Sequence, residues 1–284
     1  MRRHYLFVSL MIICLLLCHK QVLPANVFPV DKTDYDAQDR LTVYVSDGHD
    51  DETIQHMYYS ILYRSNNKIN IVIYKMIEEN DESSLNFKYR WDNTCDIATN
   101  TAVDDALLIR SNVNKNERII IYDIIDGPHR MPIMQIVYDM EKDGCSKAVF
   151  NIDTGANTNT LLFPLDAQTQ RIMDRAIIQM EYNGEERIYY STLYVSDDSL
   201  KLNIYKKAKD NKKIEDKLNT WNLVCMHTSQ WTQSQVLIMS PRVVSGNVIN
   251  MGIFSTLFAG ESHYMWFDYM NDKCADDFEP DFYD

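Results

Sequence analysis

Apolar and polar positions in this chain of 284 residues follow the pattern of β-strands. Short segments rich in Ile, Val and Tyr recur along it, and several alternate between apolar and polar positions, which is typical of strands with one buried face. Strands are expected at 41–45, 69–74, 119–122, 133–138, 177–182, 200–205, 236–239 and 264–269. Helix is expected only in short pieces such as 167–175. The sequence therefore predicts a mainly β protein.

Several short sequences occur twice, at a spacing that falls from 135 to 129 residues along the chain. The matching pairs are Phe28-Pro29 with Phe163-Pro164, Asp39-Arg40 with Asp174-Arg175, Tyr58-Tyr59-Ser60 with Tyr189-Tyr190-Ser191, Ile73-Tyr74-Lys75 with Ile204-Tyr205-Lys206, Trp91 with Trp221, and Tyr138-Asp139 with Phe267-Asp268. A repeated order of this kind indicates a duplicated structural unit. Small loop deletions account for the drift in spacing.

Corresponding strands in the two halves are followed by the turn dipeptides Asp47-Gly48 and Asn183-Gly184, which favour tight hairpins. Each half also has enough residues to bury a core of its own. We therefore expect two tandemly duplicated β-rich lobes, the first at 26–131 and the second at 132–274.

The amino terminus has the layout of a secretory signal peptide. Arg2 and Arg3 precede an apolar run at 6–18, and the small residue Ala25 follows Pro24. The apolar run is short for a membrane span. We expect a leader at 1–25 and a secreted protein, extracellular or luminal, with a retained signal anchor as the alternative.

Negative charge dominates the chain, whose formal net charge is -13 at pH 7. Removal of the leader takes away Arg2, Arg3 and Lys20 and leaves a net charge of -16. Such a balance argues against binding to nucleic acid or to an anionic membrane surface. The acidic segment 275–284 is expected to be a tail.

Four of the six cysteines, Cys95, Cys145, Cys225 and Cys274, lie outside the leader. An even number in an oxidising compartment indicates disulfides, and four cysteines allow three pairings. Because each half carries two of them, Cys95–Cys145 and Cys225–Cys274 are the most economical pairing. Each bridge would close a loop of about 50 residues and contribute about 3–4 kcal/mol of stability.

The segment 150–163 contains an apolar run, the sequence Asp153-Thr154-Gly155-Ala156, a polar stretch with Thr160, and a second apolar run. A hairpin is expected before it, with strands at 132–138 and 148–150 and a turn at Lys142-Asp143-Gly144. This arrangement resembles the catalytic loop of the aspartic proteases, both retroviral and pepsin-like. In that family two carboxylates share a proton and activate a water molecule. An ordinary polar loop between two strands is the alternative interpretation.

The resemblance implies a role for each residue of the loop. Asp153 would supply the catalytic carboxylate, Thr154 would fix the loop through its hydroxyl, and Gly155 would let the backbone approach the second carboxylate closely. The turn Tyr182-Asn183-Gly184 would be the tip of a flap hairpin, and the segment around Gly252 would cross beneath the catalytic loop.

The first half lacks an Asp-Thr-Gly sequence, because the position equivalent to Asp153 falls at Cys18 in the leader. Asp123 also stands where the second half has Gly252. A catalytic pair would therefore require a homodimer, with one Asp153 from each chain and activity at acidic pH.

Other chemistries find less support in the sequence. The histidines outside the leader show no metal-binding spacing, and no serine-hydrolase elbow or phosphate-binding loop occurs, so we expect no metal and no cofactor. The repeated Tyr-Tyr-Ser-x-Leu-Tyr stretch fits a strand with one core face, or a tyrosine-lined binding groove. Two functions follow as hypotheses: an aspartic endopeptidase acting on a peptide or protein substrate, or a catalytically inactive secreted protein that binds a partner.

Overall fold

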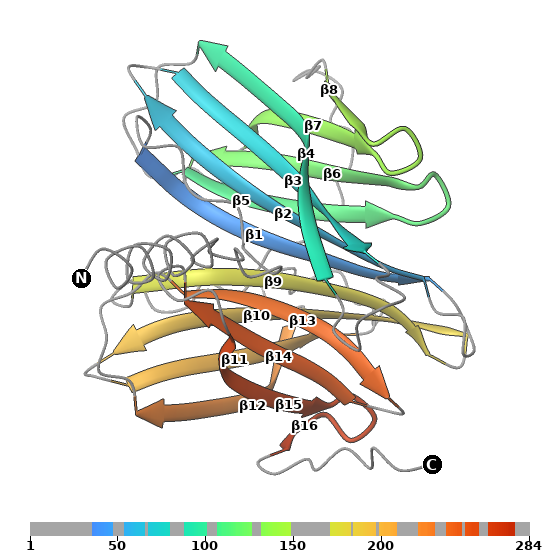
Figure 1. Cartoon of the computed structure of the whole chain (residues 1–284), viewed down its shortest axis with the longest axis vertical. Coiled ribbons are helices and arrows are strands. Elements are labelled where there is room, and N and C mark those ends of the chain that lie inside the picture. The colour runs from blue at the N-terminus through green and yellow to red at the C-terminus, as the bar shows by residue number, and fades with distance from the viewer. Residues whose placement is uncertain are drawn as a thin grey trace, which may run out of the picture.

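The computed structural model describes residues 36–47, 54–65, 68–79, 88–100, 107–126, 132–148, 171–182, 184–196, 199–208, 221–230, 237–245, 248–255 and 261–275. Every regular element in these ranges is a β-strand (Figure 1). The first half of the chain supplies β1 (Asp36–Asp47), β2 (Ile54–Ser65), β3 (Lys68–Glu79), β4 (Lys88–Asn100), β5 (Leu107–Asn114), β6 (Ile119–Asp126), β7 (Pro132–Asp139) and β8 (Gly144–Lys147). The second half supplies β9 (Arg171–Tyr182), β10 (Glu185–Ser196), β11 (Ser199–Lys207), β12 (Trp221–Gln230), β13 (Leu237–Ser245), β14 (Val248–Ser255), β15 (Glu261–Asp268) and β16 (Lys273–Ala275).

The mainly β fold class is confirmed, and all the strands expected from the sequence overlap observed strands. The short helix expected at 167–175 is wrong for 171–175, which belong to β9, while 167–170 lie outside the described residues. Pairing with β10 and β1 satisfies the backbone of β9 on both sides, and this outweighs the weak helical preference of a short segment. The described ranges contain no helix long and apolar enough to cross a membrane.

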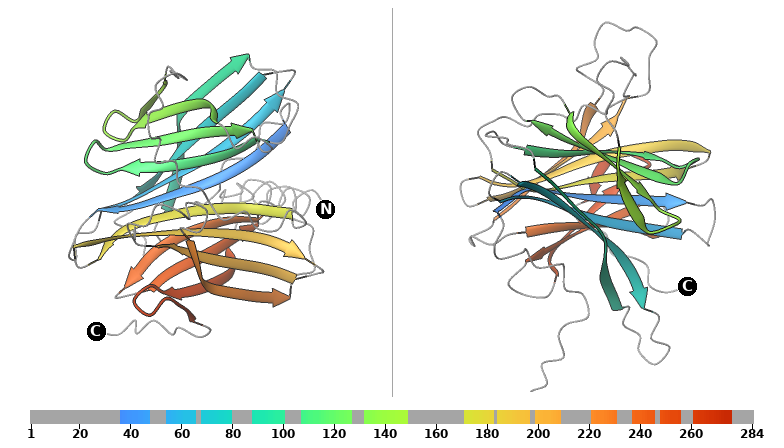
Figure 2. Two further views of the ribbon diagram at one scale, coloured as in Figure 1. Left: turned by 180° about the vertical axis from the view of Figure 1, so that it is seen from behind. Right: turned by 90° about the horizontal axis from the view of Figure 1, so that it is seen from above.

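Eight of the strands form one central sheet in the order β12-β11-β10-β9-β1-β2-β3-β4. Neighbouring strands are antiparallel within each half, and β1 and β9 are parallel where the halves meet. Two smaller sheets follow the order of the chain, β5-β6-β7-β8 and β13-β14-β15-β16. Both halves therefore use the same succession of strand pairings, and the first strand of each half lies at the centre of the molecule (Figures 1 and 2).

The two small sheets cover opposite faces of the central sheet, as a comparison of Figure 1 with the view from behind shows (Figure 2). Val43 on β1 is paired with Ile177 on β9, and both belong to the core cluster that includes β5, β6 and β7. The next pair, Tyr44 and Ile178, belongs to the cluster that includes β13, β14 and β15. Because successive residues of a strand point to opposite faces, β1 and β9 are buried on both sides.

The boundary at 131/132 expected from the sequence falls between β6 and β7, which are hydrogen-bonded neighbours. The residues 132–148 therefore lie in one sheet with β5 and β6, while the central sheet continues across the junction of β1 and β9. The hairpin expected before the Asp153 loop is present, but its second strand is β8, a few residues earlier than the expected 148–150.

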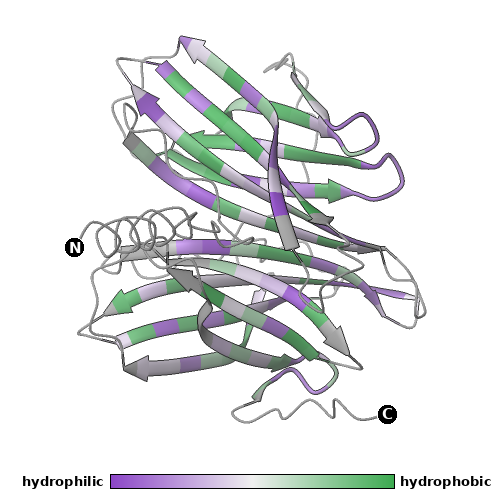
Figure 3. Cartoon of the chain, viewed as in Figure 1, coloured by the Kyte–Doolittle hydropathy of each residue, from purple (hydrophilic) through white to green (hydrophobic). Residues whose placement is uncertain are grey.

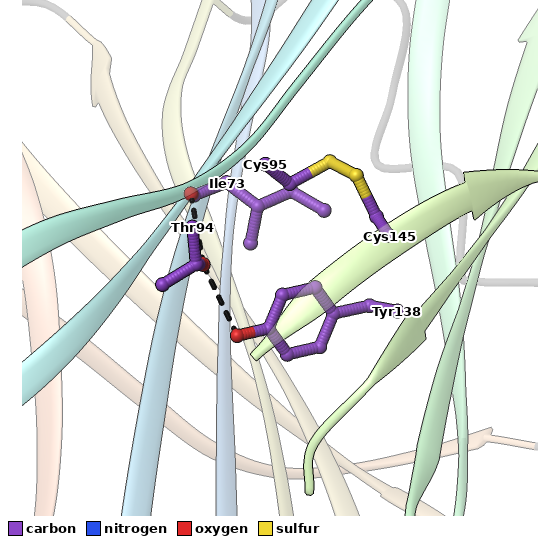
Figure 4. The surroundings of a disulfide bond; sticks show 5 residues. All are labelled: Ile73, Thr94, Cys95, Tyr138 and Cys145. Carbon is purple, nitrogen blue, oxygen red and sulfur yellow. Dashed lines mark hydrogen bonds between the residues drawn. A yellow bond between two sulfur atoms is a disulfide. The ribbon is translucent and has the colours of Figure 1, made fainter. Parts of the chain in front are cut away.

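Each half carries one disulfide, and the pairing expected from the duplication is confirmed. Cys95–Cys145 joins β4 to β8, and Cys225–Cys274 joins β12 to β16. Each bridge therefore ties an outer strand of the central sheet to the last strand of a small sheet. Beside the first bridge, the hydroxyl of Tyr138 donates to Thr94 Oγ1 at 3.1 Å, and Thr94 donates to the carbonyl of Ile73 at 3.3 Å (Figure 4).

The repeated tyrosine stretch lies in the core, on β2 and β10. The side chains of Tyr58, Tyr59, Tyr63, Tyr189, Tyr190 and Tyr194 are all buried. Because adjacent tyrosines of a strand point to opposite faces, both faces of these strands are buried, and the expected alternation of buried and exposed residues is absent. Figure 3 shows how apolar residues recur along the central strands, whereas the β5–β6 turn is hydrophilic.

The disulfides generate the first prediction. Replacing Cys225 and Cys274 together by Ser should lower the free energy of unfolding by about 3–4 kcal/mol, because the bridge closes a loop with a sequence separation of 49 residues. The matched change at Cys95 and Cys145, with a separation of 50, should cost a similar amount. Urea unfolding of the oxidised protein measures both. A loss below about 1 kcal/mol in either half would contradict a stabilising role for that bridge.

Candidate functional site

The residues singled out from the resemblance are only partly in view. Asp153, Thr154, Gly155 and Asn183 lie outside the described residues. Tyr182 pairs with Glu185, and Gly184 has a φ of 74°, so a two-residue hairpin joins β9 to β10 where Asn183-Gly184 predicted one.

This hairpin packs against its own half of the chain. The Tyr182 ring lies 5.5 Å from that of Tyr269, and its hydroxyl contacts Met270 Sδ at 3.0 Å. The turn that the resemblance identified as a flap therefore has contacts with the turn between β15 and β16. Through these contacts Tyr182 has a structural role.

A buried ion pair joins the two halves on one face of the central sheet. The Oδ2 atom of Asp39, on β1, accepts from the guanidinium of Arg175, on β9, and from the backbone N–H of Ile109 at 2.6 Å. Arg175 also donates to the carbonyl of Ile109 at 2.8 Å. The side chain of Asp39 in the first half is thus neutralised by a cation from the second half.

The duplicated residues repeat this arrangement on the other face. Asp174 Oδ2 accepts from the backbone N–H of Met239 at 2.7 Å, and the positive charges of Arg40 and Arg175 both act to lower the pKa of its carboxyl. The Asp-Arg dipeptides that revealed the duplication therefore face one another across the β1–β9 junction, each aspartate interacting with the arginine of the other half. We call these four residues the crossed pairs.

The crossed pairs include two buried carboxylates related by the duplication, as in a pepsin-like active site, but their geometry differs. Asp39 bonds to β5 on one face of the central sheet, and Asp174 bonds to β13 on the opposite face. With the sheet between them they cannot share a proton or hold one water molecule, which the aspartic protease mechanism requires. The crossed pairs stabilise the junction and are not a catalytic pair.

Two further contacts are repeated, and both hold a turn of a small sheet against the central sheet. Lys75 Nζ lies 2.7 Å from Asp143 Oδ1, and Lys206 Nζ lies 2.6 Å from Asp272 Oδ2. Both aspartates have a positive φ, of 49° and 51°. Because the same contacts occur in both halves, they belong to the scaffold.

The halves differ at their surfaces. The exposed large hydrophobic side chains in the described residues are Leu223 (51%), Met226 (64%), Tyr264 (55%) and Met270 (45%), and all four lie in the second half. The strand pairings and turns place Asn93, Asp96, Gln135 and Glu141 at the equivalent positions of the first half. At each of these four positions the first half has a polar residue, whereas the second half has an apolar residue that faces solvent.

Three of these residues lie on two sides of the second half, and Met270 lies in the turn between β15 and β16. Leu223 is paired with Tyr205 and Met226 with Asn203, so both lie on the face of the central sheet opposite the small sheet β13–β16. Tyr264 alternates with the core residue Met265 and therefore lies on the outer face of that small sheet.

The second half contains a small recess lined by residues of both its sheets. A recess lined by Leu200, Leu202, His227, Ser229, Ile253, Tyr264 and Met265 has a volume of about 20 Å³, enough for one water molecule. The described residues contain no cluster of three or more His, Cys, Asp or Glu side chains that could hold a metal ion.

Sequence reasoning missed the apolar surface positions, although the signal was available. Aligning the two halves pairs Asp96 with Met226 and Glu141 with Met270. Most apolar residues of a β protein lie in the core. A polar-to-apolar difference therefore indicates a binding surface only where the structure shows that the apolar side chain is exposed.

The crossed pairs generate a prediction on pH. Burial raises the pKa of Asp174 to about 7, although the hydrogen bond from Met239 and the charge of Arg40 act in the opposite direction. The folded state then binds a proton more readily than the unfolded state, so the unfolding free energy should rise as the pH falls from about 7 to about 4, by about 2–4 kcal/mol from this group.

Asp174→Asn should remove most of this rise in a comparison of chemical denaturation at acidic and neutral pH. Glu117→Gln, at an exposed position, changes the net charge equally and should keep the wild-type slope. An unchanged slope in Asp174→Asn would contradict the assignment of the rise to the buried carboxylate.

The chain matches no protein-family model, and no curated protein is significantly similar to it.

Proposed function

We propose that this chain is a secreted, non-catalytic protein that binds a protein partner through the surface of its second half. The observation that carries the proposal is the set of exposed apolar residues Leu223, Met226, Tyr264 and Met270, whose first-half equivalents are polar. Because the two halves share strand pairings, disulfides and turn contacts, the first half serves as an internal reference for what the fold itself requires.

The types of residue support a protein partner. Tyr and Met are enriched at protein interfaces, where they supply apolar area with a polar or polarisable atom. Exposed apolar side chains also lower solubility. A partner that covers these side chains would account for their presence on an otherwise acidic surface. The two disulfides fit an oxidising compartment, in agreement with the proposed leader at 1–25 and secretion.

Exchanging surface residues between the halves tests this function. One variant carries Leu223→Asn and Met226→Asp, and a second carries Tyr264→Gln and Met270→Glu. Because all four side chains are exposed, both variants should fold, the second without the contact of Tyr182 with Met270, while losing at least about tenfold in affinity for the partner. The measurement is quantitative cross-linking in the native extracellular fluid, followed by titration with the purified partner.

The control carries Asn93→Ser and Glu141→Gln at the equivalent positions of the first half and should retain binding. A partner bound equally by all four proteins would contradict a role for the second-half surface.

The peptidase hypothesis is a second candidate because of one specific observation, the sequence Asp153-Thr154-Gly155-Ala156 following the β7–β8 hairpin. Under this hypothesis the two halves are aspartic-protease-like lobes, and a homodimer brings two copies of Asp153 together. The crossed pairs offer no second carboxylate within one chain for such a pair, so the hypothesis depends on dimerisation.

Hydrolysis of a mixed peptide pool between about pH 3 and 7 tests this second candidate. If the protein is a peptidase, cleavage should require acidic pH, fall by at least about a hundredfold in Asp153→Asn, and stop with a general aspartic-protease inhibitor. Absence of cleavage by the folded protein, at concentrations at which it dimerises, would exclude the peptidase and leave the binding function.

A further inference from the structure

We propose that the free edge of β12 is an interface between two copies of this chain, in which the two β12 strands pair antiparallel and join the central sheets. This inference goes beyond the proposed function, because it concerns self-association and does not depend on an external partner. It rests on the hydrogen-bonding edge, the charge and the side chains of the segment Trp221–Gln230.

The position of β12 in the sheet provides the hydrogen-bonding edge. In the described part of the chain, β12 pairs with β11 on one side and with no strand on the other. Its ladder to β11 is regular from Cys225 to Gln230, with six consecutive residue pairs, and the irregularity lies before Cys225. An edge strand of this kind presents a row of backbone N–H and C=O groups to solvent. The segment 225–230 can therefore add another strand.

The charge of β12 distinguishes it from its duplicate at the opposite edge of the sheet. The segment Trp221–Gln230 contains no Asp, Glu, Lys or Arg. The equivalent residues 91–100 of the opposite edge strand β4 include Asp92 and Asp96, and Arg90, just before them, bonds to Asp92 at 2.7 Å. Charged side chains on an edge strand prevent pairing with other chains. One edge of the same sheet is thus protected, and the other is not.

The neutral character of β12 makes a second copy a suitable occupant. Two acidic chains, each with a net charge of -16 without the leader, repel one another wherever their acidic surfaces meet. At a strand without charged side chains this repulsion is weaker than elsewhere on the surface. A two-fold contact also uses the same strand on both copies, so each favourable interaction is made twice.

The side chains on the face of β12 opposite the small sheet β13–β16 fit such a contact. Leu223 and Met226 are exposed on the face shared with Tyr205 and Asn203. In an antiparallel pair they would meet residues of the other copy on that same face, where apolar contacts between strands add stability. A contact of about six residues per strand is small, so we expect a weak dimer that forms at micromolar concentrations.

Sedimentation velocity on the oxidised mature protein, from low to high micromolar concentration, tests this inference. The wild-type protein should pass from monomer to dimer across this range. Met226→Asp, which installs the residue of the first half, should raise the dissociation constant at least about tenfold, because each dimer then holds two additional negative charges at the contact. Thr228→Lys, at another exposed position of the same strand, should also weaken the dimer.

The matched control is Ala98→Asp, which adds a negative charge at the exposed position of β4 equivalent to Thr228. It should dimerise like the wild type. Hydrogen exchange supplies an independent measurement: the amides of 225–230 that point away from β11 should become more protected as concentration rises, and those of β4 should not. Thermal unfolding of each variant verifies that it is folded.

A wild-type protein that remains monomeric throughout this range would overturn the inference, as would a dimer unaffected by both Met226→Asp and Thr228→Lys. The proposed function has a separate readout, since a monomer that binds its partner through Leu223 and Met226 would retain that function and overturn only the self-association. A dimer without any partner would support the inference and contradict the proposed function.

Discussion

The crossed pairs of Asp39 with Arg175 and of Asp174 with Arg40 are the interaction on which the two-part architecture depends. The parallel ladder between β1 and β9 is registered over only four residue pairs, so backbone pairing alone provides a short junction. Each buried aspartate also receives a backbone N–H from a small sheet, at Ile109 or Met239. One carboxylate therefore connects three elements. Loss of Arg175 would leave Asp39 buried without its ion-pair partner, and breaking a buried pair in this way typically costs about 3–5 kcal/mol.

The fold class, the duplication and the disulfide pairing followed from the sequence because each depends on patterns that repeat along the chain. The strand β7 alternates between buried and half-buried positions, whereas β2 and β10 contain adjacent buried tyrosines and so lack the alternation that identifies a strand. The junction could not be predicted in the same way. The duplication marked the Asp-Arg dipeptides, but only the parallel register of β1 and β9 shows that each aspartate interacts with the other half.

The surface illustrates a different limit of sequence reasoning. Leu223 and Met226 look like core residues of a strand, and exposure separates them from buried neighbours such as Cys225. Because the fold is duplicated, each position in one half can be compared with an equivalent position in the other half. Where the versions agree, as at Lys75 and Lys206, the residue serves the scaffold. Where they differ in polarity, as at Asp96 and Met226, the difference points to a role beyond folding.

The central position of β1 also has a consequence for the order of folding. Antiparallel ladders within each half join strands that are neighbours along the chain, so each half can form from local contacts as it is synthesised. The β1–β9 junction is different, since Asp39 and Arg175 are 136 residues apart. Until β9 has been made, β1 is an edge strand with apolar residues on both faces, open to pairing with β9 of another molecule. The same symmetry that joins the halves within one chain therefore makes exchange of halves between two chains the characteristic folding error of this architecture.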